Sequence, residues 1–314
     1  MHSAFADHGD QIDVLGVTPY VEADLETAKQ NIHWAVTTAW QLDKHVDFHL
    51  DYHLDPDKGP LVWYVLDCLR AVGWTKSRTK KRVMLGHCSR FTLFREDDWE
   101  RLRREISTGD EGNALPVSFV GLPTSDLYMA SPPSPPPSSH PPPPSSSSSS
   151  RGCESSCDPK EGSRVSDPVR GTLKVPELIR RYGLDVVLGV NNVGNAFTPW
   201  GSVDPVALAC LGVGVYQAGT VEDAELLYEC VSTRARAAIG LEEETGVCVG
   251  EGRRADLLLF CDVDESGCGV VRPRRSVAEV VWDPPGRMAR AVVSGGRLVC
   301  GKGGLWDEGG FGFM

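Results

Sequence analysis

The chain of 314 residues carries 32 basic and 43 acidic side chains, a net charge of −11, and 41 % of its residues are hydrophobic. Such a chain can bury the core of one large domain or two medium ones, and its acidic balance argues against a general nucleic-acid-binding protein. No stretch is apolar for long enough to predict a membrane span, and the first residues lack the pattern of a secretory signal. We therefore expect a cytoplasmic protein whose ten cysteines are mostly buried and reduced.

Five segments with the composition of buried strands follow one another, separated by helical patterns. The expected strands are residues 12–17, 46–50, 82–86, 116–122 and 185–190. The expected helices are residues 22–42, 61–72, 97–106, 175–182, 205–218 and 221–239. This alternation predicts an α/β fold with parallel strands and right-handed crossovers. The nearly continuous apolar strands are typical of a sheet that is covered on both faces.

The end of the chain changes character. Residues 255–260, 278–282 and 291–299 have strand composition, with no helical pattern between them. The sequence Ser294-Gly295-Gly296 predicts a hairpin turn within the last of these segments. We therefore expect a small C-terminal β subdomain.

A Ser/Pro-rich stretch interrupts this pattern. Residues 131–150 hold nine Pro, ten Ser and one His, and such a segment has no apolar groups whose burial would offset the entropy of ordering it. We expect a disordered insertion over residues 131–168, barrel-type units in residues 1–130 and 169–245, and the β subdomain with its tail in residues 246–314. The Pro runs also fit an SH3 or WW domain of a partner protein.

Five strand–helix units leave two folds open, a (β/α)8 barrel that lacks three of its units and a complete doubly wound sheet. In both folds, functional side chains lie at the C-terminal ends of the strands. The polar residues that follow the predicted strands are His49, Asp51, Tyr52, His87, Thr124, Ser125, Asp126, Asn191 and Asn192. A histidine at such an end can serve as a metal ligand, a general base or a donor to a substrate. The alternative is a rim histidine that a neighbouring carbonyl satisfies.

Several segments resemble the cytosine-deaminase-like branch of the amidohydrolase superfamily. They are VDFHLDYHLDP at residues 46–56, RVMLGHCSRFTLF at 82–94 and DVVLGVNNVGNAFTPWGSVDPVALA at 185–209, with a closing ADLLL strand from Ala255 and a V…GG hairpin ending at Gly296. The resemblance implies a (β/α)8 barrel that holds one or two divalent metal ions, Zn or Fe. It also implies a metal-activated hydroxide that cleaves a C–N bond in a heterocyclic or cyclic amide substrate.

The resemblance also assigns roles to individual residues. It places His49 at a metal-ligand position and His87 at the position of a catalytic histidine that orients the hydroxide and the substrate. Asp51 matches the first acidic residue of the family's H-x-D-E pattern, and Tyr52 stands where the family has its proton-shuttling glutamate. Tyr has an ordinary pKa near 10 and would shuttle protons poorly at neutral pH. Asn191 replaces a metal-binding aspartate, and it brings no charge.

Two further points complete the expectation. Trp200 resembles a residue of a loop over the pocket mouth, where its ring could stack on a flat substrate. The sequence contains no His-x-His, although the family's first strand supplies two metal ligands in that pattern. Matching residues 12–19 to the fourth barrel strand explains both this absence and the count of five units, which favours a barrel lacking its first strands. Two functions follow: a cytosine-deaminase-like metal-dependent hydrolase, or an inactive or truncated remnant that acts as a structural or Pro-rich interaction protein.

Overall fold

The structure is a computed structural model. It describes residues 8–107, 111–129, 171–241, 250–252, 255–260, 274–286 and 290–300. The insertion expected at residues 131–168 lies outside the described residues.

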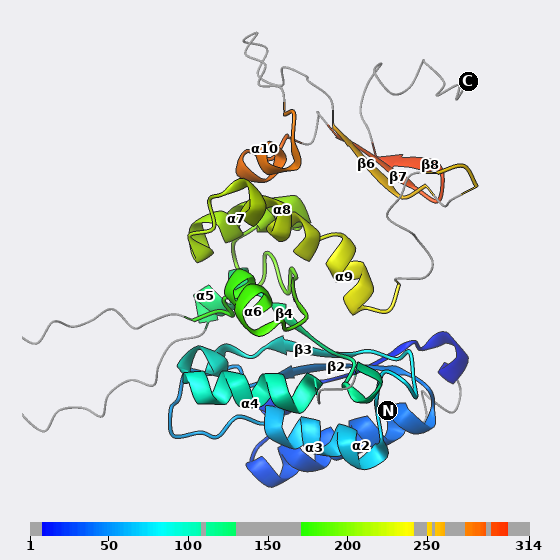
Figure 1. The fold of residues 1–314 in the computed structure, drawn as a ribbon, viewed down its shortest axis with the longest axis vertical. Coiled ribbons are helices and arrows are strands. Elements are labelled where there is room, and N and C mark those ends of the chain that lie inside the picture. The colour runs from blue at the N-terminus through cyan, green and yellow to red at the C-terminus, as the bar shows by residue number, and fades with distance from the viewer. Residues whose placement is uncertain are drawn as a thin grey trace, which may run out of the picture.

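A parallel sheet of five strands forms the centre of the fold (Figure 1). Its strands are β1 (Val14–Val17), β2 (His45–Leu50), β3 (Val83–His87), β4 (Val117–Gly121) and β5 (Val186–Leu188). They lie side by side in the order of the chain, β1-β2-β3-β4-β5. A doubly wound sheet reverses its strand order at a switch point, whereas consecutive barrel strands keep the order seen here. The topology therefore favours the barrel-type interpretation over the doubly wound one.

Helices separate successive strands. Their bounds are α2 (Leu25–Gln41), α3 (Val62–Val72), α4 (Glu96–Ser107), α5 (Pro123–Met129), α6 (Val175–Tyr182), α7 (Pro205–Tyr216), α8 (Val221–Cys230), α9 (Thr233–Ala238) and α10 (Val277–Trp282). Capping residues mark where some of these helices begin or end. The Asp24 side chain accepts a hydrogen bond from Thr27 N at the start of α2, and Gly73 adopts a left-handed conformation that ends α3.

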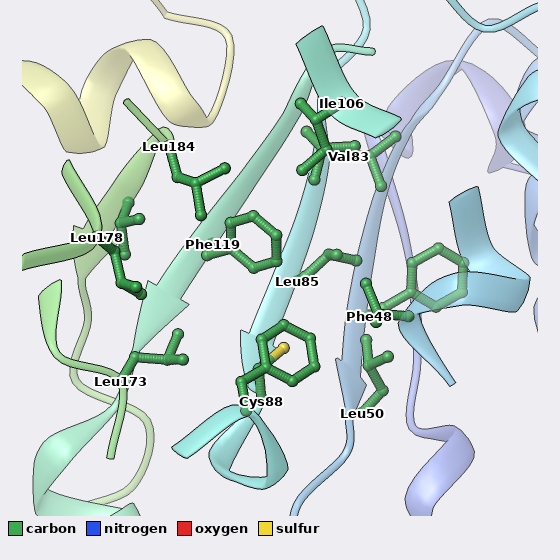
Figure 2. Packing of buried hydrophobic residues seen from close by; sticks show 14 of the residues in the cluster. Phe48, Leu50, Val83, Leu85, Cys88, Ile106, Phe119, Leu173, Leu178 and Leu184 are labelled. Carbon is green, nitrogen blue, oxygen red and sulfur yellow. The ribbon is translucent and has the colours of Figure 1, made fainter. Parts of the chain in front are cut away.

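The second strand presents two different faces. Val46, Phe48 and Leu50 are buried on one face, and His45, Asp47 and His49 are half-buried on the other. Figure 2 shows Phe48, Leu85 and Phe119 side by side on neighbouring strands, packed near Ile106 of α4 and Leu178 of α6. We expected a sheet with apolar side chains on both faces. Only the first face of β2 fits this expectation, because the second carries His45, Asp47 and His49.

Helix α9 approaches this polar face. It packs against β5, and Ala235 and Ala238 of α9 line a cavity together with His45 and His49 of β2. Gly240 lies two residues beyond the end of α9 and comes so close to β2 that a Cβ atom there would lie 2.5 Å from Cε1 of His45. His45 is held in place because its Nδ1 accepts a hydrogen bond from Arg82 N at 3.0 Å.

The predicted strand at residues 278–282 is wrong, because this segment forms α10. Ser276 caps the helix, and its side chain accepts a hydrogen bond from Glu279 N at 3.2 Å. The β-rich composition is overridden by packing, since Ala278, Val280 and Val281 are buried and α10 contacts α7 and α8.

The helix predicted over residues 221–239 also differs, because the structure divides it into α8 and α9. Ser232 lies between the two helices, and its side-chain oxygen bonds the carbonyl of Tyr228 at 2.6 Å. A hydroxyl that bonds the backbone in this way offers an alternative to continued helix. A further difference is α5, a short helix that follows β4 before the insertion.

The C-terminal sheet is antiparallel, as expected for a small β subdomain. It contains β6 (Leu257–Phe260), β7 (Arg290–Ser294) and β8 (Arg297–Cys300) in that order. Gly295 and Gly296 have φ angles of 55° and 79°, which suits the type I′ turn that joins two hairpin strands. The predicted hairpin is therefore confirmed.

Two smaller expectations concern cysteines and membrane spans. Cys68, Cys88, Cys210 and Cys230 are free thiols, three of them buried and Cys210 half-buried. Within the described ranges, no helix is both long and apolar enough to cross a membrane.

The contact between Gly240 and His45 can be tested by unfolding. We expect Gly240→Ala to lower the free energy of unfolding by about 2–3 kcal/mol, since it adds a left-handed alanine and displaces His45 from its hydrogen bond. Gly183 is the matched control, because it has a similar φ of 62° but nothing within 4 Å of an added Cβ atom. Gly183→Ala should cost only the backbone strain, about 1–2 kcal/mol. Equal losses in urea unfolding would contradict a specific contact between Gly240 and His45.

Candidate active site

His87 is the centre of a buried polar cluster at the end of β3. It ends β3, its side chain is 1 % exposed, and both it and Cys88 have positive φ angles of 65° and 48°. Non-glycine residues in this conformation are strained and cluster at functional sites. Its Nδ1 lies 2.8 Å from Oδ1 of Asp126, and its Nε2 is buried without a hydrogen-bond partner among the described residues.

Asp126, in the first turn of α5, is the partner of His87. Its second oxygen, Oδ2, accepts hydrogen bonds from Thr172 Oγ1 at 2.7 Å and from Leu122 N at 3.2 Å. Burial raises the pKa of Asp126, and the hydrogen bond to His87 opposes this rise. The sequence pattern placed Asp126 after a strand end but gave it no role, and only its position beyond β4 could have signalled one.

Aromatic rings surround His87. The ring of Tyr52 stacks on it with centroids 3.7 Å apart and planes inclined by 15°, and Tyr20 meets it edge-on at 5.9 Å. The hydroxyl of Tyr52 donates to the carbonyl of Ser125 at 3.0 Å. Burial raises the pKa of Tyr52 well above its usual range, so the phenol is neutral. Its hydroxyl proton is used in the hydrogen bond to the Ser125 carbonyl.

His49 approaches His87 from the neighbouring strand. The two ring centroids lie 4.9 Å apart, in an edge-on arrangement. The room for His49 comes from Gly86, its register partner on β3, where an added Cβ atom would lie 3.3 Å from the ring. His49 Nε2 lies 3.5 Å from Oδ2 of Asp47, whose other oxygen is buried and has no hydrogen-bond partner among the residues that the structure describes.

Asp51 holds the start of a helix. Its two carboxylate oxygens accept hydrogen bonds from Leu61 N at 2.7 Å and Val62 N at 3.2 Å, just where α3 begins. Burial raises the pKa of Asp51 to about 7, against the opposing effect of these two donors. Both oxygens therefore have a structural use, and the catalytic role that the resemblance implies for Asp51 stays a prediction.

A cavity of about 380 Å³ lies along the polar face of the sheet. Some of the predicted site residues line it and others do not. His49 and Asn191 line it, with apolar neighbours such as Met84 and Val120, whereas His87, Asp51, Tyr52 and Trp200 are not among its lining residues. Asn191 Nδ2 donates to Ser125 Oγ at 3.2 Å. Trp200 is 42 % exposed and does not line this cavity.

The residues present do not fit a resident catalytic metal ion. A catalytic zinc site normally takes three protein ligands, and no group of three His, Cys, Asp or Glu side chains within the described part of the chain could hold a metal ion. Both oxygens of Asp51 and both of Asp126 are already hydrogen-bonded within the protein. Of the predicted site residues, two histidines and one amide remain, and these three side chains do not make a complete ligand set.

Fold and site together define an α/β protein with a five-stranded parallel sheet in chain order and a pair of histidines at adjacent strand ends. Solved hydrolases share this fold. The chain matches 5-methylcytosine deaminase from Klebsiella pneumoniae at 17 % identity with a TM-score of 0.65, covering 93 % of this chain and 57 % of that one. It also matches N-isopropylammelide isopropylaminohydrolase from Burkholderia multivorans at 19 % identity and a TM-score of 0.59, with 93 % and 56 % covered.

A third match is the adenosine deaminase from Xanthomonas campestris with bound zinc, at 16 % identity and a TM-score of 0.53, covering 92 % of this chain and 52 % of that one. The chain therefore spans little more than half the length of these proteins. Their resemblance confirms the expected amidohydrolase likeness at the level of fold. No family model matches the sequence, and no curated protein matches it either.

The structural role of Asp51 can be tested by removing its carboxylate. We expect Asp51→Ala to lower the free energy of unfolding by about 1–3 kcal/mol, because the backbone N–H groups of Leu61 and Val62, at the start of α3, lose their acceptor. Asp55 is the control, since its carboxylate accepts one exposed backbone hydrogen bond from Asp57, and Asp55→Ala should change stability by less than about 0.5 kcal/mol. An Asp51→Ala protein as stable as the native chain in urea unfolding would contradict this role.

Proposed function

We propose that the chain forms the five-unit part of a (β/α)8-type barrel and carries the two-histidine portion of a site for hydrolysis of a C–N bond in a heterocyclic or cyclic amide compound. The observation that carries this proposal is the sheet in chain order, which brings the rings of His49 and His87 to 4.9 Å at the ends of adjacent strands. In this view residues 1–130 and 169–245 belong to one domain, interrupted by the insertion at 131–168, and residues 246–314 form the β subdomain.

The cavity supports a small planar ring as the ligand. Its volume of about 380 Å³ falls within the usual range of small-molecule pockets. Apolar side chains such as Val120 and Leu122 suit the faces of a ring, while His49 and Asn191 offer hydrogen bonds to its polar edge. The matched deaminases of 5-methylcytosine and adenosine are named for substrates of this kind.

Hydrolysis itself needs more than these residues. The described donors do not make the complete metal site that the proposed chemistry requires, so we propose that groups from outside this chain must complete it. Without them, the chain binds its ligand and does not turn it over. His87, with its partner Asp126, would then transfer a proton or orient the substrate.

Ligand binding is the first test. 5-Fluorocytosine, which occupies the Klebsiella deaminase in one matched structure, should bind the purified chain in a calorimetric titration. We expect His49→Ala and Asn191→Ala each to weaken binding about five- to tenfold, through the loss of one hydrogen bond. Trp200→Ala is the control and should leave binding unchanged, because Trp200 does not line the cavity. Binding that depends on Trp200 and ignores Asn191 would refute the cavity as the binding site.

Metal content and turnover are the second test. We expect the purified chain to hold less than one metal ion per molecule by elemental analysis, and to release no ammonia from cytosine or 5-methylcytosine even with added zinc. His49→Ala should reduce the residual metal, whereas His33→Ala should not, because His33 is an exposed residue on α2. One metal ion per chain with turnover that His49→Ala abolishes would overturn the incomplete-site proposal, and would make Tyr52 and Asn191 working parts of a modified site.

The second candidate is a catalytically inactive relative that acts as a structural or Pro-rich interaction protein. The stacking of Tyr52 on His87, at the position where the resemblance requires a proton-shuttling glutamate, favours it. Reading the transcript upstream of Met1 distinguishes the two: a Pro-Gly turn followed by His-x-His would support the hydrolase. For the second candidate, an SH3 or WW domain should bind a peptide spanning residues 131–144.

A further inference from the structure

The hydrogen bond between His87 and Asp126 raises the question of which atom carries the shared proton. The two atoms lie 2.8 Å apart and both side chains are buried, at 1 % and 0 % exposure. A neutral imidazole has one N–H and one lone pair. The tautomer therefore decides whether the buried Nε2 presents a lone pair or a hydrogen.

We propose that Asp126 is a positioning residue that fixes the proton of His87 on Nδ1 and leaves Nε2 as an unprotonated acceptor, and that Thr172 and Leu122 N hold Asp126 in place for this task. The catalytic consequence rests on the proposed function, because an acceptor at Nε2 matters only if a substrate or a ligand reaches it. The tautomer itself is a property of the chain and can be measured without turnover.

The environment of Asp126 explains why its carboxylate is the acceptor. Oδ2 receives a hydroxyl donor from Thr172 and a backbone donor from Leu122, and two donors on one oxygen suit an ionised carboxylate. Oδ1 is left for His87, whose Nδ1 then donates to it. The arrangement resembles the aspartate that sets the histidine tautomer in serine proteases, although no serine hydroxyl bonds Nε2 here within the described residues.

The environment of Nε2 agrees with this assignment. Nε2 is buried without a hydrogen-bond partner in the part of the chain that the structure describes, and the rings around the imidazole are those of Tyr52, His49 and Tyr20. The Tyr52 hydroxyl donates elsewhere, to Ser125 O. An N–H at Nε2 would find no acceptor here, so placing the proton on Nδ1 avoids an unsatisfied buried donor.

The test is nitrogen NMR of the full chain labelled with ¹⁵N-histidine, recorded at pH values above the titration of the ring. The signals of His87 are assigned by their loss in His87→Gln. We expect a protonated, pyrrole-type Nδ1 and an unprotonated, pyridine-type Nε2. The reverse pattern would place the proton on Asp126 or on Nε2, and would overturn the proposal.

Asp126→Asn gives the sharper comparison. Leu122 N can only donate, so the carboxamide oxygen must face it, and the amide NH₂ must then face His87. Because that NH₂ is a donor, Nδ1 must become the acceptor, and we expect the tautomer of His87 to reverse. Thr172→Val is the matched control, since it removes one hydrogen bond to Asp126 but keeps the carboxylate, and the tautomer should stay unchanged.

These outcomes are separable from those of the proposed function. A native tautomer with no ligand binding would leave the positioning role intact and refute the binding site. An Asp126→Asn protein that keeps the proton on Nδ1 would refute the positioning role whatever the chain binds. If Asp126→Asn does not fold, the spectra of the native chain and of Thr172→Val still decide the assignment.

Discussion

The register between β2 and β3 is the constraint on which the site depends. Pairing His49 with Gly86 and Leu50 with His87 brings two histidines from adjacent parallel strands to the same end of the sheet. Gly86 favours this pairing, because an added Cβ atom there would lie 3.3 Å from the His49 ring and crowd it. A slip of one residue would move every side chain of a strand to the opposite face, and the apolar positions Phe48 and Leu85 oppose such a slip because both are fully buried.

The same register gives β2 its two unlike faces. Val46 and Phe48 stabilise the packing against the helices, whereas His45, Asp47 and His49 face the cavity that α9 borders. Polar residues at alternate positions would be costly in the interior of a sheet covered on both faces, unless each found a partner. Here they find Arg82 N and one another, and the cavity leaves room for a ligand beside them.

The sequence was informative wherever a pattern is local. Strand composition and alternation with helices predicted all five strands of the central sheet, and the Gly295-Gly296 turn predicted the hairpin. The predictions failed where contacts between residues far apart in the sequence decide the structure. Residues 278–282 look like a strand, and they form a helix because α7 and α8 bury one side of it. The role of Asp126 could not be predicted because its partners, His87 and Thr172, lie 39 and 46 residues away.

The carboxylates show why the described residues make an incomplete metal site. Asp51 is bound to two helix N–H groups, and Asp126 is bound to His87, Thr172 and Leu122. Turning Asp126 toward a metal ion would leave Leu122 N unpaired inside the protein, at a cost of about 1–3 kcal/mol, and would release His87 from its orientation. The fold therefore uses its buried acids to hold a helix and a histidine, and a metal ion bound beside His49 would need its remaining ligands from outside the described residues.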